Sequence, residues 1–324
     1  MQRRRYRLAL AVTALLGAAS LAVAADRYPS RPVKIVVGFA AGGGSDTATR
    51  LFAAKLSDLW GQQIVVENRG GAGGIMAAET VAHAVPDGYT LLNCGISHVL
   101  RALLYKKLSF DPRRDFAPIS PIATFANVVV VRPDSPFKTL GDLLAYARAN
   151  PGKLHYGSSG IGGSMHLTME LFKARAGVDL VHVPYKGGGP AFADLLAGQL
   201  DVNFDNSTTM AGPVHQGQVR ALAVSTAARW PTLPEVPTAA EAGVPGFDVM
   251  PFYGLCAPAA TPEPILDKLS ADTLTVLRNP EVRQRFAAQS IQAAPMTRRE
   301  YGAFLDREFE IWSRTLKSAG VEPE

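Results

Sequence analysis

The sequence predicts an α/β protein built from two blocks in series, each a mainly parallel sheet flanked by helices. Short apolar runs rich in β-branched residues alternate with amphipathic helical segments along most of the 324-residue chain. Glycine-rich loops join several of these strands to the helices that follow. The chain is longer than one ordinary domain, which favours two blocks over one.

The first block opens with the strand 32–39, PVKIVVGF. The helix that follows carries apolar residues at helical spacing, namely Ala48, Leu51, Phe52, Leu56 and Leu59. Two further strands are expected at 62–68 and 89–95, with the helical segment IMAAETVAHAV between them. This β-α-β-α-β order predicts a parallel sheet with right-handed crossovers.

The second block resumes the pattern after a proline-rich stretch. One helix runs from Ser164 to Gly177, and another ends at Gly198. The proline-dense segment 230–247 predicts an ordered surface crossing that leads to a strand at 249–258. The other expected strands are 127–133, 154–159, 178–185, 200–205 and 219–226.

Helices close the chain. Pro262 and Pro264 stand where a helix begins, because the first helical turn tolerates a missing N–H. Thr297 to Glu300 form a capping box before the last helix. These helices could cover the second block or return to the first, and the sequence leaves both arrangements open.

The amino terminus has the pattern of a secretory signal peptide, expected at residues 1–25. Four arginines precede the uncharged run LALAVTALLGAASLAVAA, whose small residues suit cleavage after Ala24 or Ala25. A membrane anchor is the rival interpretation, which the shortness and alanine content of the run disfavour. We therefore expect a soluble, exported protein.

The charge balance argues against a nucleic-acid partner. The formal net charge is +5, from 33 basic and 28 acidic residues. Four of the arginines lie in the first 25 residues, which contain no acid, so the remainder has 29 basic against 28 acidic residues, a net of +1. A protein that binds the phosphate backbone needs a clear basic excess.

Cys94 and Cys256 are the only cysteines. Each ends a predicted strand, so one disulfide in an oxidising compartment is possible, but we expect two buried thiols. Two cysteines cannot form a structural zinc site by themselves.

Three strand–loop–helix junctions carry the residues best suited to binding: FAAGGGSD at 39–46, GSSGIGGSMH at 157–166 and PYKGGGPA at 184–191. In parallel sheets, ligands bind at the edge where strands end and helices begin. Helix N-termini offer unpaired N–H groups to carboxylate or phosphate, and glycine lets the anion reach the main chain. A purely structural interpretation is also open, since Ser45, Asp46 and Ser164 can act as helix N-caps.

The motifs disfavour several other chemistries. Neither a GxxxxGK[ST] phosphate loop nor a GxGxxG dinucleotide motif occurs in these junctions, which argues against a pyrophosphate ligand. A GxSxG nucleophile motif around Ser159 fails because Ile161 stands where glycine is needed. No two histidines have HxxxH spacing. We expect no catalytic residue, no metal site and no cofactor.

His166 and Asp205 each have two interpretations. His166 lies in the second junction, where it either packs at the helix start or donates to a bound oxyanion. Asp205 ends a buried strand beside Asn206 and Ser207, where it either caps a turn or binds a ligand amine.

A family resemblance connects these observations. It covers residues 28–320, with the motifs in matching order. The chain resembles the Bug family, the extracytoplasmic solute-binding receptors of tripartite tricarboxylate transporters. The stretches that carry the resemblance are YPSRPVKIVVGFAAGGGSDTATR, VVENRGGAGG, PDGYTLL, YGSSGIGGSMHL, VPYKGGGPAFADLLAGQLDVNFD, RALAVST and LPEVPTAAEAGVPGF.

The resemblance implies a type II-like, two-lobed periplasmic binding protein fold with a cleft between the lobes. Lobe 1 would combine residues 26–125 with 240–324, and lobe 2 would be 126–239. The implied protein is a monomeric periplasmic receptor that closes around a small organic carboxylate and delivers it to membrane permease subunits, without enzymatic activity. Two alternatives remain open: the same receptor signalling to a sensor kinase, and an exported enzyme acting on a carboxylic acid.

The expected site follows from the same resemblance. In the family, amides of the loop after the first strand, here 40–46, and of the loop 158–166 hold a carboxylate, partly through water. The loop 186–189 lines the cleft, and the position of Asp205 faces the far end of the ligand. The chain departs from the family after the third strand, where Ser97 could replace a hydroxyl contact. The expected ligand-binding residues are Phe39, Ala40, Gly43, Gly44, Ser45, Asp46, Ser97, Ser158, Ser159, Gly160, Gly163, Ser164, His166, Tyr185, Gly187, Gly188 and Asp205.

Overall fold

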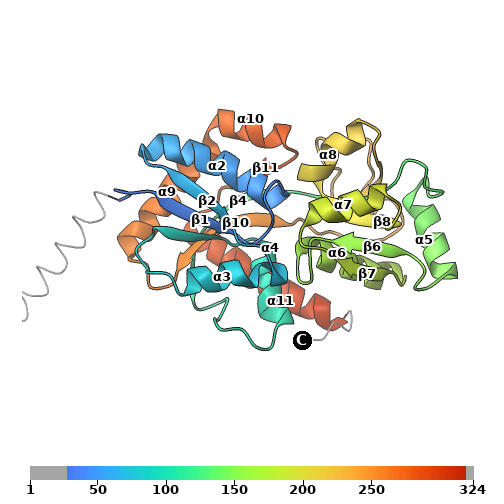
Figure 1. The fold of residues 1–324 in the computed structure, drawn as a ribbon, viewed down its shortest axis with the longest axis horizontal. Helices are drawn as coiled ribbons and strands as arrows, with labels where there is room; N and C mark the ends of the chain where they lie inside the picture. The colour runs from blue at the N-terminus through green and yellow to red at the C-terminus, as the bar shows by residue number, and fades with distance from the viewer. Residues whose placement is uncertain (1–27, 319–324) are drawn as a thin grey trace, which may run out of the picture.

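Two sheets, each flanked by helices, lie side by side in the computed structural model, which describes residues 28–318 (Figure 1). This arrangement confirms the predicted α/β fold class. The expected signal peptide, residues 1–25, lies outside the described residues. Within residues 28–318, no helix combines the length and the apolar character that crossing a bilayer requires.

The first sheet has the strand order β11-β4-β10-β3-β1-β2. β1 pairs in parallel with β2 and β3, whereas β10 runs antiparallel between β3 and β4. Most strands of this sheet therefore share one direction, which β10 and the short β11 oppose. The strands are β1 (Val33–Val37), β2 (Ile64–Asn68), β3 (Thr90–Asn93), β4 (Phe116–Thr124), β10 (Phe252–Pro258) and β11 (Gln292–Ala293).

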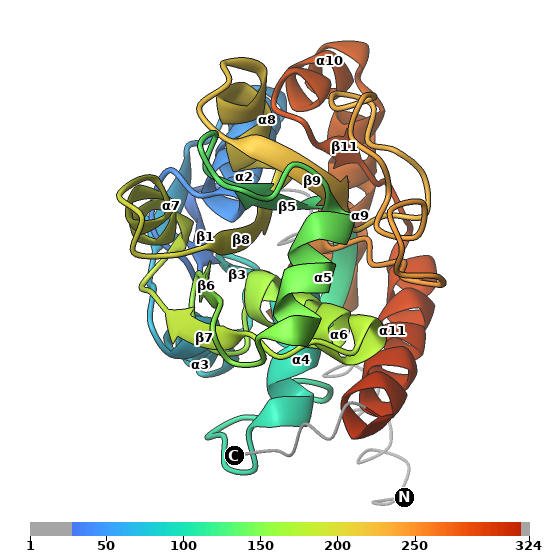
Figure 2. The same cartoon turned by 90° about the vertical axis from the view of Figure 1, so that its right-hand side faces the viewer.

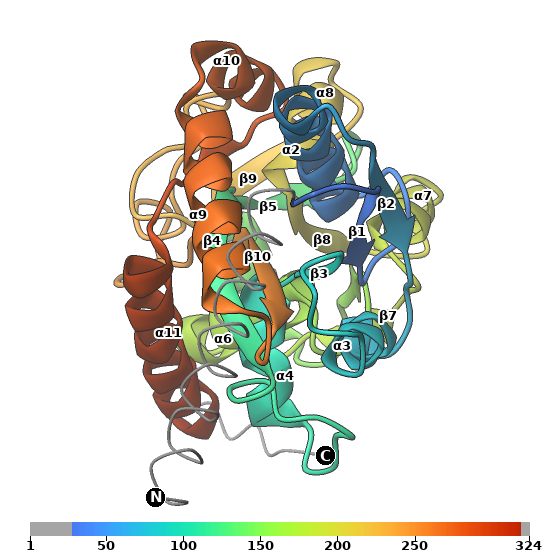
Figure 3. The same cartoon turned by 90° about the vertical axis from the view of Figure 1, so that its left-hand side faces the viewer.

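Helices cover both faces of the first sheet. Within β1, Ile35 packs toward α2 and Val36 toward α3, as strand alternation requires. Figure 3 shows that the C-terminal helices pack on this sheet. Of the two arrangements that the sequence leaves open, the one in which these helices return to the first block is therefore correct. One face carries α2 (Gly44–Trp60), α9 (Glu263–Arg278) and α10 (Pro280–Ala288); the other carries α3 (Ile75–Ala82), α4 (Ile96–Leu104) and α11 (Arg298–Ser318).

The second sheet has the order β7-β6-β8-β5-β9, in which only β5 opposes the common strand direction. Figure 2 places it toward the viewer, with α5 and α6 on one side and α7 and α8 on the other. The strands are β5 (Asn127–Val131), β6 (His155–Ser158), β7 (Val181–Pro184), β8 (Val202–Asn206) and β9 (Arg220–Val224). The helices are α5 (Leu140–Ala149), α6 (Ser164–Ala176), α7 (Gly188–Leu196) and α8 (Ser207–His215).

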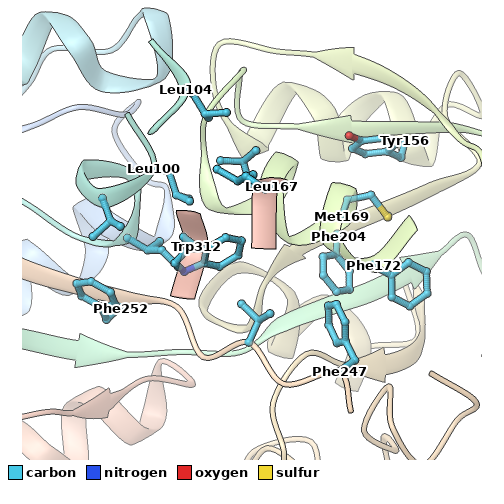
Figure 4. Close-up of a cluster of buried hydrophobic side chains, with 14 of the residues drawn as sticks. Leu100, Leu104, Tyr156, Leu167, Met169, Phe172, Phe204, Phe247, Phe252 and Trp312 are labelled. Atoms are coloured by element: carbon cyan, nitrogen blue, oxygen red, sulfur yellow. The ribbon is translucent and has the colours of Figure 1, made fainter. Parts of the chain in front are cut away.

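The chain crosses between the sheets twice, after β4 and before β10. Just before the second crossing, Phe247 packs against Phe172 of α6 and Phe204 of β8, with ring centroids 5.6 and 6.2 Å apart (Figure 4). Phe247 thus belongs to the core beside the second sheet. We therefore propose that lobe 2 extends from 126 to about 249, with 28–125 and 250–318 forming lobe 1.

The strand β4 lies in the proline-rich stretch before residue 127, where no strand is predicted. Pro118 and Pro121 cannot donate a ladder hydrogen bond. Both stand where the register with β10 shifts, opposite Cys256 and Gly254. The sheet therefore accepts two prolines at irregular positions, where strand prolines are tolerated.

Cys94 and Cys256 form a disulfide with their Cα atoms 5.8 Å apart, so the expectation of two free thiols is wrong. The N–H of Cys94 donates to the carbonyl of Gly254 at 2.9 Å, which makes Cys256 a diagonal neighbour of Cys94 on the same face of the sheet. The two residues are 162 positions apart in the chain. They meet only because β10 inserts between β3 and β4, and no local sequence pattern reveals that strand order.

Candidate functional site

A cavity of about 290 Å³ lies between the lobes. Its lining comes from the segments that follow β1, β3, β6, β7 and β8, together with residues of β10 and the beginnings of the adjoining helices. This is the carboxyl edge of the parallel strands, where α/β proteins bind ligands. The three glycine-rich junctions of the sequence all contribute to it.

Four helices that contribute first-turn residues to the cavity lining have glycine as the N-cap residue. The caps are Gly43 of α2, Gly95 of α4, Gly163 of α6 and Gly187 of α7, and no side chain within the described residues caps these helices. The structural alternative in which Ser45, Asp46 and Ser164 act as N-caps is therefore wrong. The first N–H groups of each helix have no partner inside the helix, so they are available to a ligand.

The helix ends also give the cavity its electrostatic character. Each N-terminus carries a partial positive charge that stabilises a nearby anion by about 0.3–1 kcal/mol when exposed and up to about 2 kcal/mol when partly buried. Two of the four helices come from each lobe. An anion held here would contact both lobes at once.

The surroundings of Gly44 explain why the first loop needs glycine at this position. A Cβ atom at this position would lie 2.5 Å from the hydroxyl of Tyr253 and 3.1 Å from Nδ2 of Asn206. Asn206 belongs to the other lobe, and its Nδ2 donates to the Tyr253 hydroxyl at 3.2 Å. The first turn of α2 therefore lies too close to both β10 and the second lobe for any larger residue.

Most of the residues predicted to bind ligand do meet at the cavity. They come from both lobes and from five separate strand–helix junctions. The predicted residues in the lining are Phe39, Ala40, Gly43, Gly44, Ser45, Ser97, Ser159, Ser164, Gly187, Gly188 and Asp205.

Asp46, by contrast, supports its loop from behind the cavity. Its carboxylate accepts hydrogen bonds from the N–H of Gly42 at 2.9 Å and from the side chains of Arg50 and Asn68, both at 2.9 Å. Burial acts to raise the pKa of Asp46, but these bonds outweigh it and hold the pKa below its usual value. Asp46 thus shapes the loop 39–46 and does not line the cavity.

Ser158 and His166 also lie behind the lining. The Ser158 hydroxyl is 2.7 Å from Nε2 of His182, and His166 stacks on His182 with ring centroids 4.1 Å apart. Nδ1 of His166 accepts the N–H of Gly162 at 3.2 Å. Burial lowers the pKa of His182 to about 3, so this ring is neutral at physiological pH. These contacts favour the packing interpretation of His166.

Gly160 and Tyr185 line a second cavity of about 380 Å³ that shares Phe39 and Ser159 with the first. The Tyr185 hydroxyl donates to Asp194 at 2.7 Å. Gly163 serves as the N-cap of α6 and is not part of either lining. These three predicted residues therefore stand beside the main cavity.

Several lining residues were not predicted. They lie on strands or helices whose pattern indicates ordinary core, and for most of them no sequence signal was available. They include Leu92, Asn93, Ile96, Arg101, Met165, Phe192, Asn206, Thr209, Met210, Phe252 and Tyr253.

Asp205 is a buried acid in the lining, with 1% of its surface exposed. Oδ1 accepts from the N–H of Asn206 at 2.7 Å and from the Thr209 hydroxyl at 3.0 Å, whereas Oδ2 has no partner. Burial raises the pKa of Asp205 to about 6. Its free oxygen can accept a hydroxyl or ammonium proton from a ligand, so both interpretations of Asp205 apply: it holds its own turn and faces the cavity.

The cavity lining offers little for catalysis or metal binding. Among the described residues that form it, none is histidine, cysteine or lysine. Residues 28–318 also contain no group of three His, Cys, Asp or Glu side chains arranged to hold a metal ion. The lining instead combines main-chain amides with hydroxyls and apolar side chains, which suits ligand recognition.

The chain is similar to known receptors over most of its length. The family model for the tripartite tricarboxylate transporter family receptor matches residues 48–321. Protein BugT of Bordetella pertussis is 33% identical over 93% of this chain and 93% of BugT.

Two solved structures extend the likeness to the fold. Rpa4515 of R. palustris with adipate has a TM-score of 0.88 and 36% identity, and the match covers 92% of this chain and 100% of that one. MatC from Rhodopseudomonas palustris with bound malate has a TM-score of 0.84 and 34% identity, over 89% of this chain and 100% of MatC. The chain therefore belongs to the family of tripartite tricarboxylate transporter receptors.

Proposed function

We propose that this receptor captures a small organic carboxylate between its lobes in the periplasm and delivers it to the permease subunits of a tripartite transporter. One observation carries the proposal: four helices, two from each lobe, begin with uncapped glycine at a single cavity. Such helix ends bind anions through their N–H groups. The adipate and malate found in Rpa4515 and MatC support a carboxylate as that anion.

The ligand would act as the link between the lobes. Its carboxylate accepts N–H groups from the junction 43–45 of lobe 1 and from the junctions 159–164 and 187–189 of lobe 2. A ligand bound to both lobes stabilises the closed arrangement over any open one by the free energy of the contacts that only closure permits. Closure also excludes water, which strengthens each charge-assisted hydrogen bond.

The receptor is proposed to bind without turnover and to act as a monomer. Arg101, Asp205 and Tyr253 are the ionisable side chains of the described lining, which contains no histidine, cysteine or lysine to act as a nucleophile or base. Export with cleavage of residues 1–25 completes the proposal. The mass of the protein from a periplasmic extract tests the cleavage, and light scattering tests the monomer.

The central test is a thermal-shift panel of mono-, di- and tricarboxylates, with isothermal calorimetry of each positive ligand. A ligand at 100 times its Kd adds about 2.7 kcal/mol to the unfolding free energy, which raises Tm by roughly 5–10 °C. A neutral diol of matched length is the control and should cause no shift. Failure of every carboxylate at millimolar concentration would overturn the proposal, as would mass-spectrometric evidence that the protein converts the acid chemically.

A further inference from the structure

A stack of three aromatic rings stands beside the second glycine-rich junction, outside the ligand cavity. His182 of β7 lies between Tyr156 of β6 and His166 of α6, with ring centroids 4.8 and 4.1 Å apart. The planes of neighbouring rings differ by only 22°, so the three rings are nearly parallel. None of the three residues lines the ligand cavity. The stack fixes both imidazole rings through their faces, which leaves the ring nitrogens to bond to other groups.

The segment 159–163, which joins β6 to α6, has few side chains with which to hold its own shape. Gly160 and Gly162 have φ values of 127° and 74°, conformations that residues other than glycine rarely adopt. Ser159 lies in this segment and Ser164 directly follows it, and both line the ligand cavity. The segment therefore places ligand-binding groups but depends on its neighbours for support.

Both histidines supply that support through a ring nitrogen. Nδ1 of His166 accepts the N–H of Gly162 at 3.2 Å. Nε2 of His182 lies 2.7 Å from Oγ of Ser158, and this Oγ accepts the N–H of Gly160 at 3.1 Å. The two histidines thus hold the two glycines with positive φ, one directly and the other through the Ser158 hydroxyl.

The surroundings of the stack keep both rings neutral, as the contact with Gly162 requires. Nδ1 of a histidine accepts a hydrogen bond only while it carries no proton. Burial lowers the pKa of His166, while the smaller effects of Glu170 and Lys173 oppose each other. These two residues form an ion pair at 2.9 Å. Burial also lowers the pKa of His182 to about 3. Near pH 7 the acceptor at Nδ1 of His166 is therefore present.

The supported segment also contacts the first lobe. A Cβ atom on Gly162 would lie 3.5 Å from Cε2 of Tyr105, which directly follows α4. A Cβ atom on Gly73, in the short turn η1 (Ala72–Gly74), would collide with the carbonyl oxygen of Ile161. A shift of this segment would therefore disturb the ligand-binding groups and the contact between the lobes together.

We infer that His166 and His182 are positioning residues, which hold the main chain of the segment 159–163 in the conformation that binds the ligand. The inference rests on the proposed function, in which this segment and the start of α6 bind a carboxylate. A segment that is already ordered loses little conformational freedom when the ligand binds, and fixed supporting hydrogen bonds keep its donors in place. Loss of the bonds from the histidines should therefore weaken ligand binding.

Two substitutions of His166 separate its hydrogen bond from its packing. His166→Asn places an amide oxygen near the position of Nδ1, so it keeps an acceptor for Gly162 and gives up the ring. His166→Phe keeps the ring and leaves the buried N–H of Gly162 without its partner. We expect His166→Phe to raise the Kd for a carboxylate at least about fivefold, which corresponds to about 1 kcal/mol, and His166→Asn to raise it less than about threefold.

The same comparison applies to His182, whose bonded atom is Nε2. His182→Gln places an amide group near the position of Nε2, whereas His182→Phe keeps only the stacked ring. We expect the Kd of His182→Phe to exceed that of His182→Gln by at least about twofold, the lower range for a neutral hydrogen bond. His155→Phe is the control, because this histidine stands at the other end of β6 with 48% of its side chain exposed, and it should leave the Kd unchanged.

Isothermal calorimetry measures these Kd values with adipate, malate and every other carboxylate that raises the Tm of the wild type, and thermal unfolding without ligand verifies each fold. If the histidines only packed, the phenylalanine variants would bind at least as tightly as the matching Asn and Gln variants. That order would refute the inference while leaving the proposed function intact. Binding of no carboxylate by the wild type would refute both. If His166→Phe does not fold, the order of His182→Phe and His182→Gln decides.

Discussion

Replacement of Ser164 by proline tests whether the N-terminus of α6 binds the ligand. Ser164 is the first residue of α6 and lines the cavity. Proline is favoured at the first helical position, and the preceding Gly163 has φ −75° and ψ 162°, the extended conformation that a residue before proline requires. The substitution therefore removes one amide proton from the cavity wall while the helix is retained.

The expected effect follows from the loss of one charge-assisted hydrogen bond. A hydrogen bond to a charged group contributes about 1.5–3 kcal/mol, so the Kd for a carboxylate should rise roughly 10- to 150-fold. Ser164→Ala is the matched control because it deletes the hydroxyl and keeps the N–H. Its Kd should change by less than about tenfold, the usual range for a neutral hydrogen bond.

Isothermal calorimetry with the tightest acid of the panel measures both Kd values, and thermal unfolding without ligand verifies the fold. A Ser164→Pro protein with the wild-type Tm and the wild-type Kd would refute the assignment of this amide to the ligand. Equal losses in Ser164→Pro and Ser164→Ala would instead show that the hydroxyl, not the main chain, makes the contact.

Three further substitutions test the fold and the charge of the site. Burial raises the pKa of Asp205 from 3.8 to about 6, so the folded state holds this proton more tightly than the unfolded state, and the associated stability is lost as the pH rises through that window. Asp205→Asn should therefore add about 3 kcal/mol to the unfolding free energy near pH 7.5 and little near pH 4. Urea titration at both pH values measures this difference, and equal gains at the two pH values would contradict the expectation. Replacing Cys94 and Cys256 together by serine should cost about 2–5 kcal/mol in guanidinium unfolding, and a reductant should then affect only the wild type. Phe247→Ala should lower the unfolding free energy by about 3–5 kcal/mol, because Phe247 is buried. Replacement of the half-exposed Met250 by alanine is the control and should lower it by less than about 0.5 kcal/mol. A small loss at Phe247 would argue against the lobe boundary at about 249.

The sequence predicts the glycine-rich half of the site because its signal is local. Each junction combines a β-rich run, a cluster of glycines and a helical pattern within about a dozen residues, and the carboxyl edge of a parallel sheet brings such junctions together. Gly43, Ser159 and Gly187 could therefore be placed near one ligand without knowledge of the strand order. The predicted strands agree with the observed ones within a few residues for the same reason.

The other half of the site depends on contacts that no local pattern encodes. Tyr253 reaches the cavity only because β10 inserts into the first sheet, and the same insertion joins Cys94 to Cys256. Arg101 stands in the stretch SHVLRALL, where a single arginine would ordinarily mark the solvent face of an amphipathic helix. Its burial follows from α11 and η1, which cover α4 from distant parts of the chain.

Within the described residues, glycine N-caps occur on helices that begin at or beside the cavity. Away from the cavity, α5 begins with a capping box at Thr139 and α10 with a side-chain cap from Asn279, the residue types that ordinarily satisfy the first N–H groups. At the cavity, glycine stands at these positions in α2, α4, α6 and α7, so the donors are left without an internal partner. Each uncapped end costs the empty receptor some stability, and a carboxylate that bonds to these donors removes that cost in the bound state alone. The hydrogen bonds that the empty protein lacks at these helix ends thus become available to the ligand, where they contribute to binding and to joining the lobes.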